Sequence, residues 1–415
     1  MIALSGARLV LPDRLSDPAL LLIEGDRIAA IHDATSVPAG PYERVPLDGG
    51  YVLPGFIDVH VHGLAGIDTL AGDGSVAALA ARLPRYGVTA FCPTTVACPP
   101  AALARFLAEV GLLLDAPPAG AARVLPAHLE SHFIAPAYRG AQPAACLRTA
   151  AGCVTAAGRL DPGTGSGGPA FGALDVLRIV ERHQREVGIV TLAPEVDGAL
   201  DLIHWLTARG HRVALGHSGA SFDESLAAIR AGARHATHLF NRMAPLDRRE
   251  PGLAGAVLAS PAVAAELVCD GVHVHPAMIR LALAAKGAAR LMAITDGTAG
   301  AGLAEGAQAM LGDQPITVAG GAARLADGTL AGSIATMDQV VRTLVGDAGL
   351  TLVEAATMCA TTPARELGLD GRGAIAAGAV ADLVVLDPQL AVARTYVAGR
   401  LAYAAPGAGS SSARA

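Results

Sequence analysis

The sequence has few aromatic residues and no long apolar run. Aromatic residues make up 3% of the 415 residues, so we expect a core of aliphatic side chains. No apolar run reaches the roughly 20 residues that a membrane helix needs, so we expect no membrane span. The first residues lack a basic stretch followed by an apolar one, so we expect no secretory signal.

Charge and cysteine content exclude further classes. The formal net charge is -6 without a long run of like charge, so we expect neither a nucleic-acid partner nor a membrane surface. The six cysteines form no CxxC pair, and we interpret them as reduced thiols of a cytoplasmic protein. The sequence contains one lysine, Lys286, and arginine otherwise carries the positive charge.

The middle of the chain alternates short apolar runs with amphipathic helical stretches such as residues 221–232. Parallel strands that mostly precede helices in this way are typical of a TIM barrel, the (β/α)8 form of the α/β class. The predicted strands lie near 56–62, 87–95, 123–131, 188–195, 212–218, 235–241, 264–270 and 290–296.

Both ends of the chain resemble short strands instead. We predict a catalytic barrel over 54–372 and a small β-sandwich domain built from 1–53 together with 373–404, because the ends of a barrel lie close together. We also predict a flexible loop at 161–169, a hairpin insertion at 303–333 and a disordered tail at 405–415.

Two histidines end the first predicted strand, in the stretch PGFIDVHVHG at 54–63. His60 and His62 share one strand face, so both imidazoles can reach one ion at about 2.1 Å. The carboxyl ends of barrel strands meet at one rim, and a mixture of nitrogen and oxygen ligands there favours a cation such as Zn2+. The other strand ends supply Glu130, His217, His238 and Asp296.

A lone histidine at a strand end is more often a packing residue than a ligand. Five strand ends that agree within one barrel disfavour that interpretation here. We interpret Glu195, which follows the fourth strand, as a supporting or structural residue. The histidines that we interpret as surface or packing residues are His32, His128, His132, His183, His204, His211, His235 and His275.

This ligand pattern resembles that of the amidohydrolase superfamily, and GAIAAGAVADLVVLD is similar to its closing strand motif. Many members bridge two metals with a carbamylated lysine after the fourth strand, but Lys286 lies elsewhere, so Glu130 is the candidate for the bridging acid. A glutamate ligand after the third strand resembles the pattern of the N-acetylglucosamine-6-phosphate deacetylases. The blocks HLESHFIAPAYRGAQP, ATHLFNRMAPLDRREPGLAGA and TDGTAGAG follow the order of that family.

The resemblance implies metal-dependent hydrolysis of N-acetyl-D-glucosamine 6-phosphate to D-glucosamine 6-phosphate and acetate. It implies Asp296 as the general base that then acts as the acid. The expected ion is Zn2+, with Fe2+, Mn2+ or Co2+ as alternatives. A first ion is expected on Glu130, His217 and His238, and a second on His60, His62, Glu130 and Asp296.

The resemblance also implies the contacts to the phosphosugar. The 6-phosphate would be bound by the backbone of Asn241 and Arg242, the Asn241 side chain, His273 and Arg249. Arg249 would reach the neighbouring active site of a homodimer. Ile334, in the stretch GSIATM, would contact the sugar or the acetyl group.

The sequence departs from the family pattern at two places. Glu130 is followed by Ser131 and His132, where better-known members read Glu-Gly-Pro. Gln142 stands where some members carry a histidine that polarises the substrate carbonyl, and we expect it to contact the substrate. Three alternatives stay open: a deacetylase of the galactosamine epimer, another amidohydrolase deacylase, and a metal-free scaffold. The number of ions and any oligomer larger than a dimer also stay open.

Overall fold

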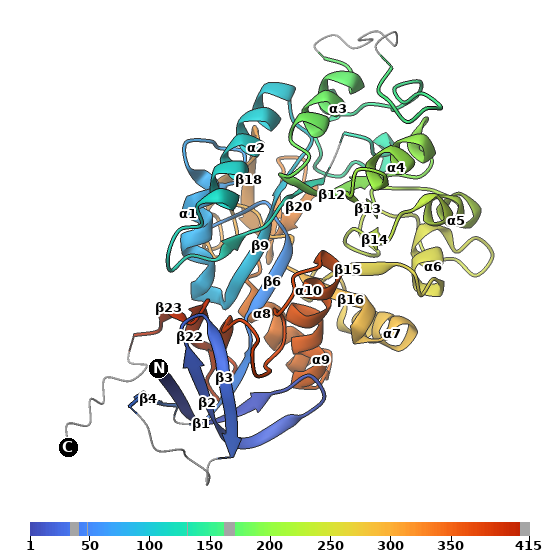
Figure 1. Cartoon of the computed structure of the whole chain (residues 1–415). Helices are drawn as coiled ribbons and strands as arrows, with labels where there is room; N and C mark the ends of the chain where they lie inside the picture. The colour runs from blue at the N-terminus through green and yellow to red at the C-terminus, as the bar shows by residue number, and fades with distance from the viewer. Residues whose placement is uncertain (34–40, 48, 131, 162–170, 407–415) are drawn as a thin grey trace.

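The structure is a computed structural model that describes residues 1–33, 41–47, 49–130, 132–161 and 171–406. Figure 1 shows strands wrapped by helices, beside a sheet that contains the first and the last labelled strands, β1 and β23. Apart from their edge residues, the predicted loop at 161–169 and the predicted tail at 405–415 lie outside the described residues, as does Ser131.

Eight strands of the described chain form a nearly closed parallel barrel, and each overlaps a predicted strand. Two hydrogen bonds join the last strand to the first: the Asp296 N–H donates to the His60 carbonyl at 3.0 Å, and the His62 N–H to the Gly297 carbonyl at 2.7 Å. The strands are β6 (Phe56–Val61), β9 (Val88–Thr95), β11 (Ala127–Glu130), β12 (Val187–Leu192), β13 (Arg212–Leu215), β14 (His235–Ala236), β15 (Ala264–Val268) and β16 (Leu291–Ile294).

Helices cover the outside of the barrel, and α5 shows how the sequence starts and stops one. Ser221 and Glu224 form a capping box that satisfies free N–H groups at its start, and Gly232 ends it at a φ of 126°. The α-helices between and after the strands are α1 (Ser75–Arg82), α2 (Pro100–Asp115), α3 (Ala173–Arg182), α4 (Ala199–Thr207), α5 (Phe222–Ala231), α6 (Gly252–Ala259), α7 (Pro276–Lys286), α8 (Met337–Arg342), α9 (Leu352–Ala356) and α10 (Thr362–Leu367).

The inside of the barrel is packed with small and aliphatic side chains, as the scarcity of aromatic residues predicts. Burial of each larger aliphatic side chain contributes about 1.5–3 kcal/mol to the stability of the fold. This packed centre leaves room for ligands only at the barrel ends. Its members include Ile57, Val59, Ile189, Val268, Met292 and Ile294.

The amino ends of the strands are tied together by one carboxylate on helix α10 (Thr362–Leu367). Glu366 contacts Arg290 at 3.0 Å, just before β16, and lies 3.5 Å from His235 at the start of β14. Burial alone would raise the pKa of Glu366, but hydrogen bonds from His235 and Arg365 outweigh burial and lower it to about 2. This end of the barrel therefore serves stability.

Both ends of the chain build a separate sheet domain, as predicted. Strand β5 (Tyr51–Pro54) pairs with β21 (Leu383–Leu386), so the two terminal segments join in a single eight-stranded sheet. The exact domain boundaries stay a prediction. The other strands are β1 (Ile2–Val10), β2 (Leu15–Glu24), β3 (Arg27–Asp33), β4 (Glu43–Pro46), β22 (Val392–Val397) and β23 (Arg400–Ala404).

The predicted insertion after β16 is a four-stranded antiparallel sheet. It consists of β17 (Gln308–Leu311), β18 (Gln314–Ala319), β19 (Ala322–Arg324) and β20 (Leu330–Ser333). All six cysteines are buried. Within the described ranges, the helices are too short or too polar to cross a lipid bilayer.

Candidate metal centre

The predicted ligands meet at the carboxyl end of the barrel. Glu130, the last residue of β11, places Oε1 2.8 Å from both His217 Nε2 and His238 Nε2. Those two nitrogens lie 3.0 Å apart. The three ligand atoms form a small triangle, and one metal ion above its centre could contact all three.

A second group of ligand atoms lies beside the first. His60 Nε2 and His62 Nε2 are 3.2 Å apart, and Asp296 Oδ1 lies 3.4 Å and 3.5 Å from them. The other oxygen of Glu130, Oε2, lies 3.3 Å from His62 Nε2. Glu130 therefore faces both groups, with Oε1 toward the first and Oε2 toward His62 of the second.

Hydrogen bonds on the far side of two rings fix which nitrogen carries the proton. His217 Nδ1 donates to the Tyr138 carbonyl at 2.9 Å, and His60 Nδ1 donates to Glu266 Oε2 at 2.9 Å. Since both partners accept, Nδ1 of each ring carries a proton, and Nε2 of each ring can turn a lone pair toward a cation in the centre. Lone pairs of nitrogen and carboxylate oxygen thus converge there, and a divalent cation fits that donor set.

Three of these side chains stand on unusual backbone. His217, His238 and Asp296 have φ values of 49°, 30° and 48°, in the left-handed region that side chains other than glycine rarely adopt. Each such residue costs roughly 1–3 kcal/mol, and such residues cluster at functional sites. The backbone here turns sharply after each strand and directs the side chain inward.

Burial and neighbouring charges oppose each other in this centre. Burial alone would raise the pKa of Glu130, but the surrounding imidazoles, His217 first, hold it well below its usual range. Burial, followed by the Glu130 carboxylate, raises the pKa of Asp296 to about 8. Burial also holds the pKa of His60 well below its usual range, so that ring is neutral. The Glu130 carboxylate is thus charged near neutral pH, while the Asp296 carboxylate readily carries a proton.

A cavity of about 510 Å3 opens onto the two ligand groups. Several buried nitrogens of the residues in its wall have no hydrogen-bond partner among the described residues, and Asn241 Nδ2 and His273 Nε2 are two of them. His273 Nδ1 donates to Asp270 Oδ2 at 2.6 Å. Burial alone would lower the pKa of His273, but this carboxylate raises it, so the ring can carry a second proton and donate from Nε2. Unpartnered buried donors are costly, so they favour a ligand that accepts hydrogen bonds.

The other predicted substrate contacts are placed differently. Gln142 and Arg242 line the cavity, and Gln142 Nε2 donates to Glu130. The Asn241 N–H is already engaged, since it donates to the His238 carbonyl at 2.9 Å. Arg249 is exposed, and neither it nor Ile334 lines the cavity.

Reasoning from the sequence missed Glu266 and the Tyr138 carbonyl. Glu266 is the only acid of the buried strand β15, and a charged residue within a buried parallel strand is an unusual signal. Glu195 accepts hydrogen bonds from Ser218 at 2.7 Å and from the Gly219 N–H at 2.6 Å. It therefore fixes the turn after His217, which agrees with a structural role.

Comparisons with known proteins agree with this geometry. The profile of the amidohydrolase family matches residues 206–402. The chain is 38% identical to the N-acetylglucosamine-6-phosphate deacetylase of Danio rerio, over 86% of this chain and 85% of that protein. It is 35% identical to the N-acetylgalactosamine-6-phosphate deacetylase of Escherichia coli O157:H7, over 96% of this chain and 98% of that protein.

A solved structure extends the likeness to three dimensions. It is a mutant N-acetyl-D-glucosamine-6-phosphate deacetylase of Mycobacterium smegmatis in complex with N-acetyl-D-glucosamine-6-phosphate. It superposes with a TM-score of 0.84 at 35% identity, over 97% of this chain and 99% of that chain. The barrel and its histidine and carboxylate cluster define a metal-dependent hydrolase. More closely, this chain belongs to the N-acetylglucosamine-6-phosphate deacetylase family of amidohydrolases.

Proposed function

We propose that this chain hydrolyses N-acetyl-D-glucosamine 6-phosphate to D-glucosamine 6-phosphate and acetate. The observation that carries the proposal is the convergence of Glu130, His217 and His238 beside Asp296 at the base of a cavity. The relatives named above act on phosphorylated N-acetyl hexosamines, which supports the substrate class. We place the reaction in the cytoplasm, since the spacing of the six cysteines shows no CxxC pair and no disulfide framework.

We propose two cation sites at this centre. Glu130, His217 and His238 would hold the first ion, and His60, His62, Glu130 and Asp296 the second. Zn2+ suits this mixture of imidazole and carboxylate ligands, and Fe2+, Mn2+ or Co2+ would fit it as well. A bound divalent cation supplies Lewis acidity, which activates water near neutral pH and polarises the amide carbonyl.

Asp296 moves the proton in the proposed reaction. Its carboxylate accepts a proton from the attacking water and then donates that proton to the leaving nitrogen. A proton carrier works best when its pKa lies near the working pH, and the raised pKa of Asp296 meets that requirement. Gln142 has a second N–H beside the one that donates to Glu130, and we assign it to the substrate carbonyl.

The phosphate site is proposed at the other end of the cavity. Asn241 Nδ2 and His273 Nε2 are buried donors that a phosphate would satisfy, and Arg242 lies in the same wall. Charge-assisted hydrogen bonds to phosphate contribute about 1.5–3 kcal/mol each. Ile334 stays assigned to the sugar or the acetyl group, although it lies outside the cavity lining.

We propose a homodimer in which Arg249 completes the active site of the neighbouring subunit. Arg249 is exposed and lies outside the cavity lining of its own chain, so it is free to serve another. A guanidinium suits phosphate because its planar donors match the phosphate oxygens.

The test is a turnover assay with chelator-treated protein and with protein reconstituted with Zn2+. Release of acetate from N-acetyl-D-glucosamine 6-phosphate only after reconstitution is the expected result. The galactosamine epimer is the second candidate, because the Escherichia coli relative covers nearly the whole chain. The same assay on both 6-phosphates compares the epimers. Absence of turnover of either sugar by the reconstituted protein would refute the proposal.

A further inference from the structure

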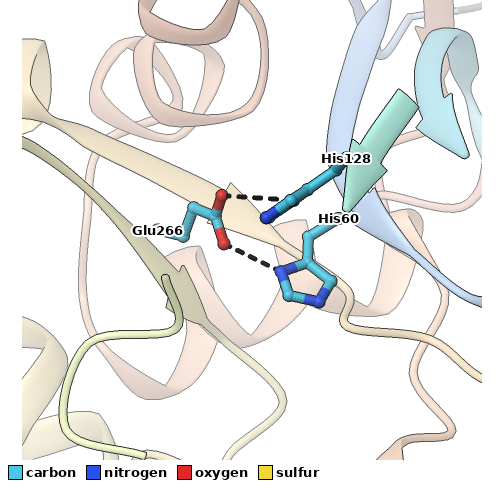
Figure 2. Close-up of side chains that lie close together, drawn as sticks. All are labelled: His60, His128 and Glu266. Carbon is cyan, nitrogen blue, oxygen red and sulfur yellow. Dashed lines mark hydrogen bonds and ion pairs between the residues drawn. The ribbon is translucent and has the colours of Figure 1, made fainter. Parts of the chain in front are cut away.

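We propose that Glu266 is a positioning residue that fixes the ring of His60 and thereby builds the second cation site. The proposal rests on the proposed function. Glu266 stands in the middle of β15, and its side chain points into the barrel, where it is fully buried. Figure 2 shows its two oxygens facing two rings, one oxygen toward His60 and the other toward His128.

The contact with His60 sets the direction of the lone pair on that ring. Glu266 Oε2 accepts from His60 Nδ1 at 2.9 Å, so Nδ1 carries the proton and Nε2 is left with its lone pair. That lone pair lies among His62 Nε2 at 3.2 Å, Asp296 Oδ1 at 3.4 Å and Glu130 Oε1 at 3.7 Å. Without an acceptor behind it, the ring could place its proton on Nε2 and lose its value as a ligand.

The same carboxylate also reaches the first group of ligands. The backbone N–H of His238 points to Glu266 Oε2 at 3.4 Å. This contact is longer than the one to His60 and involves the main chain, which other hydrogen bonds also hold. We therefore expect Glu266 to act mainly on the second site.

Glu266, His60 and His128 could instead be a cation site of their own, since their ligand atoms lie close together. The hydrogen bonds of His128 argue against that reading. Its Nδ1 donates to the Val59 carbonyl at 3.1 Å, and its Nε2 accepts from the Thr191 hydroxyl at 2.8 Å. No lone pair of His128 is left for a cation beside Glu266. The ring is a packing residue that fills the space behind His60.

Two variants separate the hydrogen bond from the charge. Glu266→Gln keeps a carbonyl oxygen where Oε2 stands, so it can still accept from His60, but it removes the negative charge. Glu266→Leu has a similar volume and removes the acceptor. Loss of such a supporting partner typically weakens metal binding by about 10- to 100-fold. Asp58→Asn is the matched control. Asp58 is a buried carboxylate on β6, the strand of His60, and it accepts from the His60 backbone N–H without contacting the imidazole ring.

The measurement is calorimetric titration of chelator-treated protein with Zn2+, with the folded state checked by circular dichroism. We expect two Zn2+ ions per chain in the wild-type protein and in Asp58→Asn. In Glu266→Leu the second ion should bind about 100-fold more weakly or not at all, while the first ion keeps its affinity within about threefold. Glu266→Gln should lie between, at about 10-fold.

Three results would overturn the role of Glu266: a wild-type protein that binds one ion, a Glu266→Leu protein that binds two ions normally, or equal weakening of both ions. If Glu266→Leu does not fold, Glu266→Met, which also lacks an acceptor for His60 Nδ1, decides, and unchanged affinity for the second ion in that variant overturns the role. The titration needs no substrate. Failure of the deacetylase assay would therefore refute the proposed function and leave this measurement standing.

Discussion

Asp296 and His60 contact each other through both main chain and side chain. The Asp296 N–H donates to the His60 carbonyl at 3.0 Å, and Asp296 Oδ1 lies 3.4 Å from His60 Nε2. The hydrogen bond joins the last barrel strand to the first, and the side-chain contact unites the proposed proton carrier with a proposed ligand. Closure of the barrel therefore also assembles the reactive groups.

Replacement of Asp296 by asparagine should separate binding from catalysis. The amide keeps the shape of the carboxylate but cannot carry the proton, so kcat should fall by about 100- to 10,000-fold. KM should change little. Steady-state kinetics on N-acetyl-D-glucosamine 6-phosphate measure both, and Asp327→Asn, at an exposed position, is the matched control. Near-normal turnover would assign the proton transfer to another group.

The number of Zn2+ ions bound per chain tests whether the proposed ligands form two cation sites. Wild-type protein saturated with Zn2+ and freed of excess ion should hold two ions per chain by elemental analysis. His62→Ala should hold one, because the triangle of Glu130, His217 and His238 stays intact. One ion in the wild-type protein would remove the second site.

Arg249→Ala should weaken binding of the phosphate. Loss of a charge-assisted hydrogen bond costs about 1.5–3 kcal/mol, so KM should rise by about 10- to 150-fold. Arg248→Ala is the matched control, since the neighbouring arginine is equally exposed. An unchanged KM in Arg249→Ala would contradict the assigned phosphate contact.

Mixed dimers test whether Arg249 acts across subunits. An Arg249→Ala subunit keeps Asp296, and an Asp296→Asn subunit keeps Arg249, so a dimer of the two regains one complete site. Activity of the co-expressed pair should exceed that of either variant alone. Activity that equals the average of the two parents would mean that each subunit supplies its own arginine.

Glu366→Gln should destabilise the fold in a pH-dependent way. The pKa of Glu366 is about 2 in the folded protein and lower than in the unfolded chain, so its ion pairs stabilise the fold above about pH 4.5 and this contribution is lost as pH falls toward 2. Because Glu366 is only partly buried, the effect at pH 7 should be about 1 kcal/mol. Melting temperatures of both proteins should differ at pH 7 and approach each other at pH 3. A difference that stays constant with pH would contradict this assignment.

The sequence was sufficient for the barrel and for the convergence of its ligands, since each ligand follows a recognisable apolar strand. It was not sufficient for Glu266, because its role depends on β15 lying two strands from β6 once the barrel closes, and no local pattern encodes that proximity. The turn conformation of His217 also had no signal, since histidine does not mark a left-handed residue as glycine does. Arg242 was predicted as a backbone donor, whereas its place in the cavity wall depends on the folded loop.

The sheet of β17–β20 supplies Leu311, Leu330 and Gly332 to the cavity wall, whereas the six proposed ligands all stand in or just after the ends of barrel strands. Changes of shape in that insertion can therefore alter which acyl group or sugar fits, while the hydrolytic centre keeps its geometry. A few substitutions in the sheet of β17–β20 could therefore change the substrate specificity of such a chain.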